Sequence, residues 1–174
     1  LRPVEVLEDG KRIGIYPADH YHITCSIDFP HPLIGRQSFD LELTRENYAR
    51  EIAPARTFGF LREVDALRNM GLIRGGSLEN ALVLNDTGLM NRTGLRFPDE
   101  FCRHKLLDLI GDLALIGRPV LGHVLAERAG HYMHVALVDR LMRDRTLWEE
   151  VEWEGAAAGA VAAAVAGAAL SAGR

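Results

Sequence analysis

The chain has 174 residues, a mass of 19.2 kDa and a formal net charge of −4, with 48% hydrophobic and 25% charged residues. These values are ordinary for one globular domain with its own core, and they exclude disorder over most of the length. Acidic residues (24) outnumber basic ones (20) and no dense basic run occurs, which argues against a generic nucleic-acid binder.

Stretches rich in β-forming residues open the chain. Turn-forming residues such as Gly10 and Pro17 separate them, so we expect four strands. Thr44 is a plausible N-cap for a helix that continues through residue 52. The expected strands lie at residues 3–7, 12–16, 22–29 and 38–43. An extended segment at 55–60, a helix at 62–70 and a strand at 80–84 follow.

The clearest helix spans residues 99–116. Pro98 and Asp99 open it and Gly117 closes it. One apolar stripe at helical spacing is formed by Leu106, Leu109, Ile110 and Leu113. The remaining expected elements are a strand at 119–127, a helix at 131–143 and a strand at 150–153. This order predicts an α+β fold, in which a sheet packs against helices.

Residues 155–174 differ from the rest in composition. Residues 155–173 hold no charge, and 11 of these 19 are alanine. The stretch is long enough to span a bilayer, but alanine and glycine contribute little transfer free energy. We therefore expect a domain at residues 1–154, followed by a low-complexity tail that forms no stable membrane span.

His104 and Asp108 lie four residues apart on the 99–116 helix, so their side chains share one face. An imidazole and a carboxylate at this spacing can bind one divalent cation, for which zinc is a good match. A catalytic zinc needs three protein ligands, however, and ordinary helix-surface ion pairs have the same spacing. The spacing alone favours the surface pair.

Two more side chains can take part in acid–base chemistry. Asp112 continues the face of Asp108 and can hold a histidine behind a metal. His131 follows a strand and begins a helix, a junction where α/β-type folds often place catalytic groups. Considered one at a time, Asp112 is more commonly a solvated carboxylate, and His131 is more commonly a helix N-terminal residue capped by the preceding turn. His134 is expected to be structural or exposed.

The remaining polar candidates are weaker. Lys105 projects about 100° away from His104 around the helix and can reach an anionic group, although a surface lysine is the commoner role. Thr57 and Phe58 lie in an extended, glycine-containing segment, where core packing is the alternative to lining a cleft. Four histidines have no partner at a telling spacing and are expected to be ordinary, namely His20, His22, His31 and His123.

Four separated segments carry a family resemblance. They are ARTFGF (55–60), GGSLENALVL (75–84), GLRFPDEFCRHKLLDLIGDL (94–113) and RAGH (128–131). In this order and spacing the chain resembles the UDP-3-O-acyl-N-acetylglucosamine deacetylases, zinc amidohydrolases of bacterial lipid A biosynthesis, from about residue 3 to 153. The resemblance implies one half of a two-domain β-α-α-β sandwich with a small βαβ insert. It also implies a cytoplasmic protein, which the two cysteines, Cys25 and Cys102, suit because they form no disulfide framework.

The resemblance assigns catalytic roles that the spacing alone does not. His104 and Asp108 are similar to two of the family's three Zn²⁺ ligands. His131 is similar to the histidine that stabilises developing charge and protonates the leaving amine, with Asp112 as its carboxylate partner. Thr57 is similar to the threonine that donates to the oxyanion.

The resemblance also assigns substrate contacts with UDP-3-O-acyl-N-acetylglucosamine. Lys105 and Arg128 match positions that meet the diphosphate, and Phe29 is similar to the aromatic residue that stacks on uracil. Phe58, next to Thr57, is expected to contact the substrate as well. The residues expected to line the acyl-chain passage are Leu61, Val64, Ile73, Leu78 and Val83.

The chain resembles only the second half of the family. The first half should carry a His-x-x-Glu-His-like motif with the general base and the third zinc ligand, and this sequence contains no such motif. We therefore expect the polypeptide alone to be inactive or nearly so, and to expose a sheet face that packs on a first-half domain. The alternative is a non-catalytic domain that binds a UDP-sugar lipid or a partner, or a folded remnant with neither activity.

Overall fold

The computed structural model describes residues 2–63 and 77–152. The strands are β1 (Val4–Glu8), β2 (Lys11–Tyr16), β3 (Tyr21–Phe29), β4 (Gly35–Glu42), β5 (Thr57–Phe60), β6 (Ala81–Leu84) and β7 (Gly122–Glu127). The α-helices are α1 (Arg45–Asn47), α3 (Glu100–Leu113) and α4 (His131–Arg143). A π-helical turn at Tyr48–Ile52 and 3₁₀ turns at Ala114–Ile116 and Arg145–Leu147 complete the described elements.

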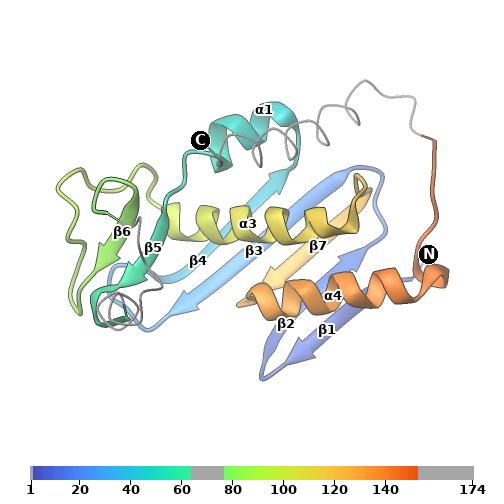
Figure 1. Ribbon diagram of the computed structural model, residues 1–174, viewed down its shortest axis with the longest axis horizontal. Coiled ribbons are helices and arrows are strands. Elements are labelled where there is room, and N and C mark those ends of the chain that lie inside the picture. The colour runs from blue at the N-terminus through green and yellow to red at the C-terminus, as the bar shows by residue number, and fades with distance from the viewer. Residues whose placement is uncertain (1, 64–76, 153–174) are drawn as a thin grey trace.

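The main sheet has the strand order β1-β2-β7-β3-β4. β7 lies between β2 and β3, antiparallel to the first and parallel to the second, while the other neighbours are antiparallel. A strand from late in the chain is therefore inserted between two strands from its beginning (Figure 1). This insertion places His123 directly opposite His22.

Helices α3 and α4 lie side by side across one face of this sheet (Figure 1). Side chains alternate along a strand, and the helix-facing positions, such as Ile23 and Val124, are fully buried. The apolar stripe of α3 meets them with Leu106 and Leu109, which are also fully buried. Each such side chain contributes about 1.5–3 kcal/mol on burial, so this interface fixes the orientation of α3. The predicted α+β architecture is confirmed.

β5 and β6 form a separate two-stranded parallel sheet, with Thr57 opposite Ala81. Parallel strands need a crossover connection, so this pairing matches the predicted small insert. Most of the predicted helix at 62–70, together with Val64 and Ile73, lies outside the described residues.

Several element boundaries differ from the sequence predictions. The strand expected at 38–43 begins at Gly35, and the helix expected through residue 52 is α-helical only over Arg45–Asn47 before the π-helical turn. The 99–116 helix tightens into a 3₁₀ turn after Leu113 and stops at Gly117, whose φ of +75° is left-handed. The strand predicted at 119–127 begins at Gly122. Residues 150–152 form no strand; instead Glu150 pairs with two arginine side chains.

The predicted Ala-rich tail at 155–174 lies outside the described residues, so the boundary at 154 stays a prediction. Within residues 2–63 and 77–152, no helix combines the length and apolarity that crossing a bilayer requires.

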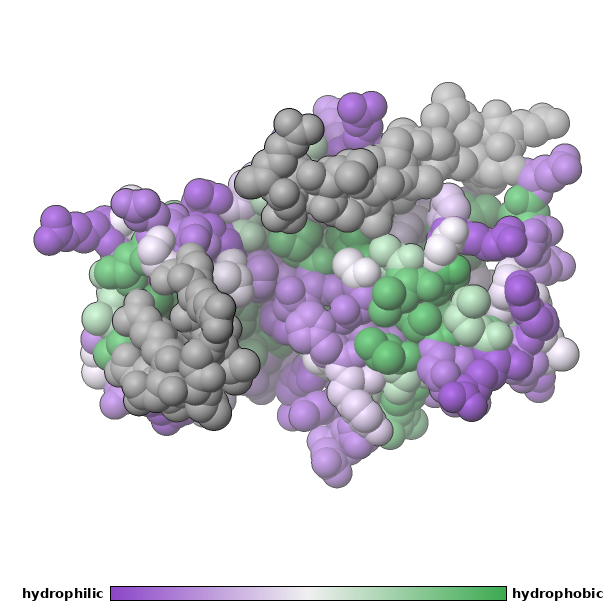
Figure 2. All heavy atoms as spheres, viewed as in Figure 1, coloured by the Kyte–Doolittle hydropathy of each residue, from purple (hydrophilic) through white to green (hydrophobic). Residues whose placement is uncertain are grey.

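The two faces of the molecule differ in polarity. The sheet face without helices carries polar side chains, including His22, Thr24 and Asp40. Several large exposed apolar side chains lie on the helical layer, over which Figure 2 shows apolar surface. Those on this layer are Leu115, Tyr132, Val135 and Met142, between 43% and 73% exposed, while others lie elsewhere, such as Leu7 of β1 at 66%. The predicted packing of a sheet face on a first-half domain stays a prediction.

Candidate active site

A pocket of about 320 Å³ opens where β3, β5, α3 and the start of α4 meet. It brings together residues far apart in the sequence, among them both predicted metal ligands and the predicted acid. The lining residues are Phe29, Thr57, Phe58, Gly59, Phe60, Glu63, His104, Lys105, Asp108 and His131.

His104 and Asp108 point to the same place, as their spacing on α3 predicts. The distance from His104 Nε2 to Asp108 Oδ1 is 3.4 Å. His104 Nδ1 lies 3.3 Å from the carbonyl oxygen of Ala55, which only accepts hydrogen bonds, so Nδ1 carries the proton and Nε2 keeps its lone pair. Burial lowers the pKa of His104 although Asp108 opposes the shift, which favours the neutral ring that a metal needs.

Asp108 is the centre of the polar part of the pocket. Lys105 donates to Asp108 Oδ2 at 2.7 Å, and His131 Nε2 lies 3.8 Å from the same oxygen. The Asp108 carboxylate thus has the Lys105 ammonium group on one side and the imidazoles of His104 and His131 near it, so it is placed to share a metal ion with an imidazole.

Asp112 lies one helical turn beyond Asp108 and holds two histidines of α4. Its Oδ2 atom is 2.6 Å from His131 Nδ1 and 2.7 Å from His134 Nδ1. Because Nδ1 of His131 is engaged, its Nε2 is the nitrogen that faces the pocket. The predicted pairing of Asp112 with His131 is therefore present.

His134 was expected to be structural or exposed, and it is structural, although its sharing of Asp112 with His131 was not predicted. Its side chain is 2% exposed, and burial lowers the pKa of its ring despite the Asp112 hydrogen bond. The signal was its spacing of one helical turn from His131, which puts both rings on the side of α4 that faces α3. His134 and His131 contact the same carboxylate oxygen, so the buried His134 also restrains the position of the Asp112 side chain.

A buried ion pair positions the segment that carries Thr57 and Phe58. Glu100, fully buried at the start of α3, accepts hydrogen bonds from the backbone N–H of Arg56 at 3.0 Å and from its Nε at 2.8 Å. Phe58 then packs edge-on against Phe101, with ring centroids 5.2 Å apart. The exposed Thr57 hydroxyl is left at the pocket wall.

Several predicted substrate residues lie elsewhere. The described residues that line the pocket do not include Arg128, whose guanidinium donates to the carbonyl of Gly10 in the β1–β2 turn. Nor do they include the passage residues Leu61, Leu78 and Val83. Conversely, Glu63 and Phe60 line the pocket although the sequence analysis did not single them out, because neither stands at a spacing that marks a site.

Comparisons with known proteins show the family of the chain. The family model described as LpxC, UDP-3-O-acyl N-acetylglycosamine deacetylase, matches residues 1–143. A UDP-3-O-acyl-N-acetylglucosamine deacetylase of Solibacter usitatus is 55% identical over 88% of this chain and 52% of its own length. Those of Myxococcus xanthus and of Neisseria meningitidis serogroup A are 52% and 43% identical, over 86% and 88% of this chain and 48% and 50% of their own lengths.

The chain spans about half the length of these curated relatives. The match nevertheless covers most of the described residues, including α3, β7, the start of α4 and thus the whole polar part of the pocket. On this ground, the chain belongs to the LpxC family of UDP-3-O-acyl N-acetylglycosamine deacetylases.

Proposed function

We propose that this chain supplies the C-terminal half of a cytoplasmic, zinc-dependent enzyme that hydrolyses the acetamide of UDP-3-O-acyl-N-acetylglucosamine in lipid A biosynthesis. The observation that supports this most is the meeting of His104, Asp108 and His131 in one pocket. Three relatives bearing the name of this activity, at 43–55% identity, support the same reaction.

The donor geometry fits zinc. Two donors at roughly 2.0–2.1 Å from one tetrahedral zinc lie about 3.3 Å apart. His104 Nε2 and Asp108 Oδ1 are 3.4 Å apart, and the Ala55 carbonyl keeps the first of them deprotonated. When bound, zinc supplies Lewis acidity, which polarises an amide carbonyl and makes water nucleophilic near neutral pH.

The protein side chains handle protons and charge around that carbonyl. His131 Nε2 faces the pocket and donates a proton to the departing glucosamine nitrogen. Asp112 accepts from Nδ1 of the same ring, which orients His131 and offsets its positive charge. The Thr57 hydroxyl donates to the carbonyl oxygen as negative charge builds on it.

Substrate recognition follows from the rest of the lining. Lys105, which pairs with Asp108 in this structure, would pair with the diphosphate where Asp108 holds the metal. Phe29 offers an aromatic surface for uracil, and its ring is already held edge-on by Phe58 at 5.6 Å. Arg128 reaches the diphosphate only after its guanidinium leaves the Gly10 carbonyl. The acyl passage along Leu61, Val64, Ile73, Leu78 and Val83 stays a prediction.

A first-half domain completes the site. We assign to it the third zinc ligand and the general base, which then face His104 and Asp108 across the pocket. The exposed apolar side chains of the helical layer, Tyr132 and Val135 among them, provide a surface for this contact. The first half is supplied either in the same polypeptide or by a separate one.

Activity after complementation tests this function. The 174-residue chain, a first-half domain from a relative and the mixture are each assayed for acetate release with Zn²⁺ present. Because a general base contributes about 10²–10⁴-fold, the chain alone should be at least 100-fold less active than the mixture. Asp108→Asn should abolish the activity of the mixture, whereas Asp139→Asn, an exposed pair with Arg143, should not change it.

Two results would contradict this assignment. Full activity of the chain alone would refute the half-site, and a mixture that binds zinc without releasing acetate would refute the reaction. If zinc binds with a Kd weaker than micromolar while UDP still binds and raises Tm, the result would favour the alternative function. That alternative is a non-catalytic domain that binds a UDP-sugar lipid.

A further inference from the structure

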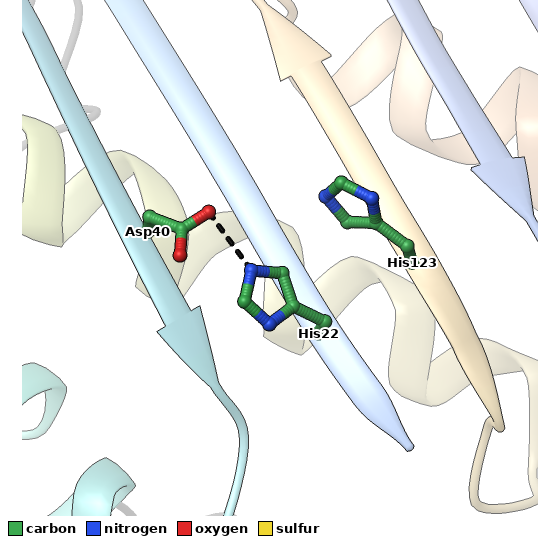
Figure 3. Close-up of side chains that lie close together, drawn as sticks. All are labelled: His22, Asp40 and His123. Carbon is green, nitrogen blue, oxygen red and sulfur yellow. Dashed lines mark hydrogen bonds and ion pairs between the residues drawn. The ribbon is translucent and has the colours of Figure 1, made fainter. Parts of the chain in front are cut away.

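A second cluster of potential metal ligands lies on the open face of the main sheet. His22 of β3, Asp40 of β4 and His123 of β7 each offer one donor atom, and these atoms all lie within 4.8 Å of one another. Figure 3 shows the three side chains rising from three adjacent strands. None of them lines the pocket of the candidate active site.

The strand register explains this meeting. β3 and β7 pair in parallel with His22 directly opposite His123. The next residues along, Ile23 and Val124, are fully buried under the helices, so both histidines point to the opposite face. Neighbouring strands lie about 4.8 Å apart, and the two ring centroids are separated by the same 4.8 Å.

Hydrogen bonds already hold the three donors together. His22 Nε2 lies 2.8 Å from Asp40 Oδ2, and the Thr24 hydroxyl donates to the same oxygen at 2.6 Å. Thr24 Oγ1 is also 2.8 Å from His123 Nε2.

We propose that His22, Asp40 and His123 bind one divalent transition-metal cation at a site separate from the candidate active site. Two imidazole nitrogens and one carboxylate oxygen form a donor set that zinc and its first-row neighbours accept. The Asp40 side chain is 60% exposed, so water has access to a fourth position. Thr24 remains bonded to Asp40 and orients the ligating carboxylate.

Binding here ties β7, from late in the chain, to the consecutive strands β3 and β4. A cation held by β4, β3 and β7 links residues 40, 22 and 123 and is lost when the sheet opens. A ligand that binds only the folded state stabilises it by mass action. The bound cation therefore raises the thermal stability of the main sheet, a role that does not depend on catalysis. The alternative is a purely hydrogen-bonded polar network.

A zinc titration of a pocket-deleted chain separates the two sites. In the full 174-residue chain, His104→Gln, Asp108→Asn and His131→Gln together remove the donors of the candidate active site. Isothermal calorimetry should still detect one Zn²⁺ per chain, and zinc at about 100 times Kd should raise Tm by several degrees. Adding His22→Gln or His123→Gln should weaken zinc binding at least about tenfold, since each removes a ligand.

His20→Gln is the matched control. His20 stacks edge-on against His22 at 5.7 Å but bonds to Asp19, so its removal should leave the zinc affinity unchanged. Circular dichroism without metal checks that each variant folds; if one does not, Asp40→Asn, the most exposed ligand, replaces it. No zinc bound to the pocket-deleted chain, or equal weakening by His20→Gln and His22→Gln, would overturn the site.

Discussion

Asp112 shows how one carboxylate oxygen can organise two side chains. Its Oδ2 atom lies within 2.7 Å of Nδ1 in both His131 and His134. His134 is almost fully buried and packs between α3 and α4, while His131 is 63% exposed. The exposed ring has little packing to hold it, so its orientation toward Asp108 depends on this hydrogen bond.

Asp112→Asn should therefore affect activity more than folding. An amide keeps the shape but loses the charge that stabilises both rings, so we expect kcat of the complemented enzyme to fall about 10–100-fold. The weakened bond to buried His134 should cost about 1–3 kcal/mol of unfolding free energy. Steady-state kinetics and urea denaturation measure the two effects, with Asp139→Asn, an exposed carboxylate of α4, as the control. An unchanged kcat would rule out the positioning role.

At the scale of elements, the pair of Arg56 and Glu100 joins the β5 segment to α3. Glu100 is fully buried, and its second oxygen accepts from Arg56 Nη2 at 3.1 Å. The guanidinium also donates to the carbonyl of Gly94 at 2.7 Å. The pair thus fixes the approach of residues 55–60 to the helix that carries His104.

Glu100→Gln should destabilise the fold strongly. It leaves the Arg56 guanidinium buried without a countercharge, and breaking such a pair costs about 3–5 kcal/mol of unfolding free energy. Urea denaturation at about pH 7 measures this loss. Glu46→Gln, which removes an exposed helix pair with Arg50, should change the free energy by less than about 0.5 kcal/mol. Equal effects of the two substitutions would contradict the structural role of Glu100.

The same pair predicts a pH dependence. Burial alone would raise the pKa of Glu100, but hydrogen bonds from Arg56 and from the backbone of Arg96 lower it overall below 4.5. The unfolded state then binds the proton first, so the stability from Glu100 is present above about pH 4.5 and is lost as the pH falls. The difference in Tm between wild type and Glu100→Gln should shrink from about pH 7 to about pH 3.5. A constant difference would contradict the lowered pKa.

At the scale of the whole molecule, a group of exposed apolar side chains lies on the helical layer. Tyr132, Val135 and Met142 project from the outer side of α4, and Leu115 lies nearby after α3. The chain covers about half the length of its curated relatives. Our proposal that a first-half domain completes the site uses this group as the contact.

Val135→Ser should weaken assembly without unfolding the chain. The side chain is 46% exposed, so we expect Tm of the isolated chain to stay within about 2 °C and the Kd for a first-half domain to rise about tenfold. Calorimetric titration with that domain measures the Kd. Leu7→Ser, 66% exposed on the edge strand β1, is the matched control and should leave it unchanged. Equal effects of both substitutions would exclude the helical layer as the contact.

Most elements, and the shared face of His104 and Asp108, were predictable because they depend on local spacing, whereas the metal-binding role of these two side chains came from the family resemblance and stays a proposal. The stripe of α3 and the one-turn step from His104 to Asp108 are properties of a helix, whatever surrounds it. The prediction of a final strand at 150–153 was wrong for residues 150–152, which the structure describes. Ion pairs of Glu150 with Arg118 and Arg145 outweigh the β-propensity of this segment. Arg128 was expected at the pocket from family likeness, yet it bonds to Gly10.

The amino-acid sequence by itself determined the α+β class, the family and the shared face of His104 and Asp108, because periodicity and motifs act over a few residues. Only the tertiary structure decided which distant groups meet. The insertion of β7 between β2 and β3 brings His123 beside His22, and the packing of α4 on α3 puts His131 and His134 on one oxygen of Asp112. Strand order and helix packing set these contacts, and neither can be recognised from the spacing of residues in the sequence.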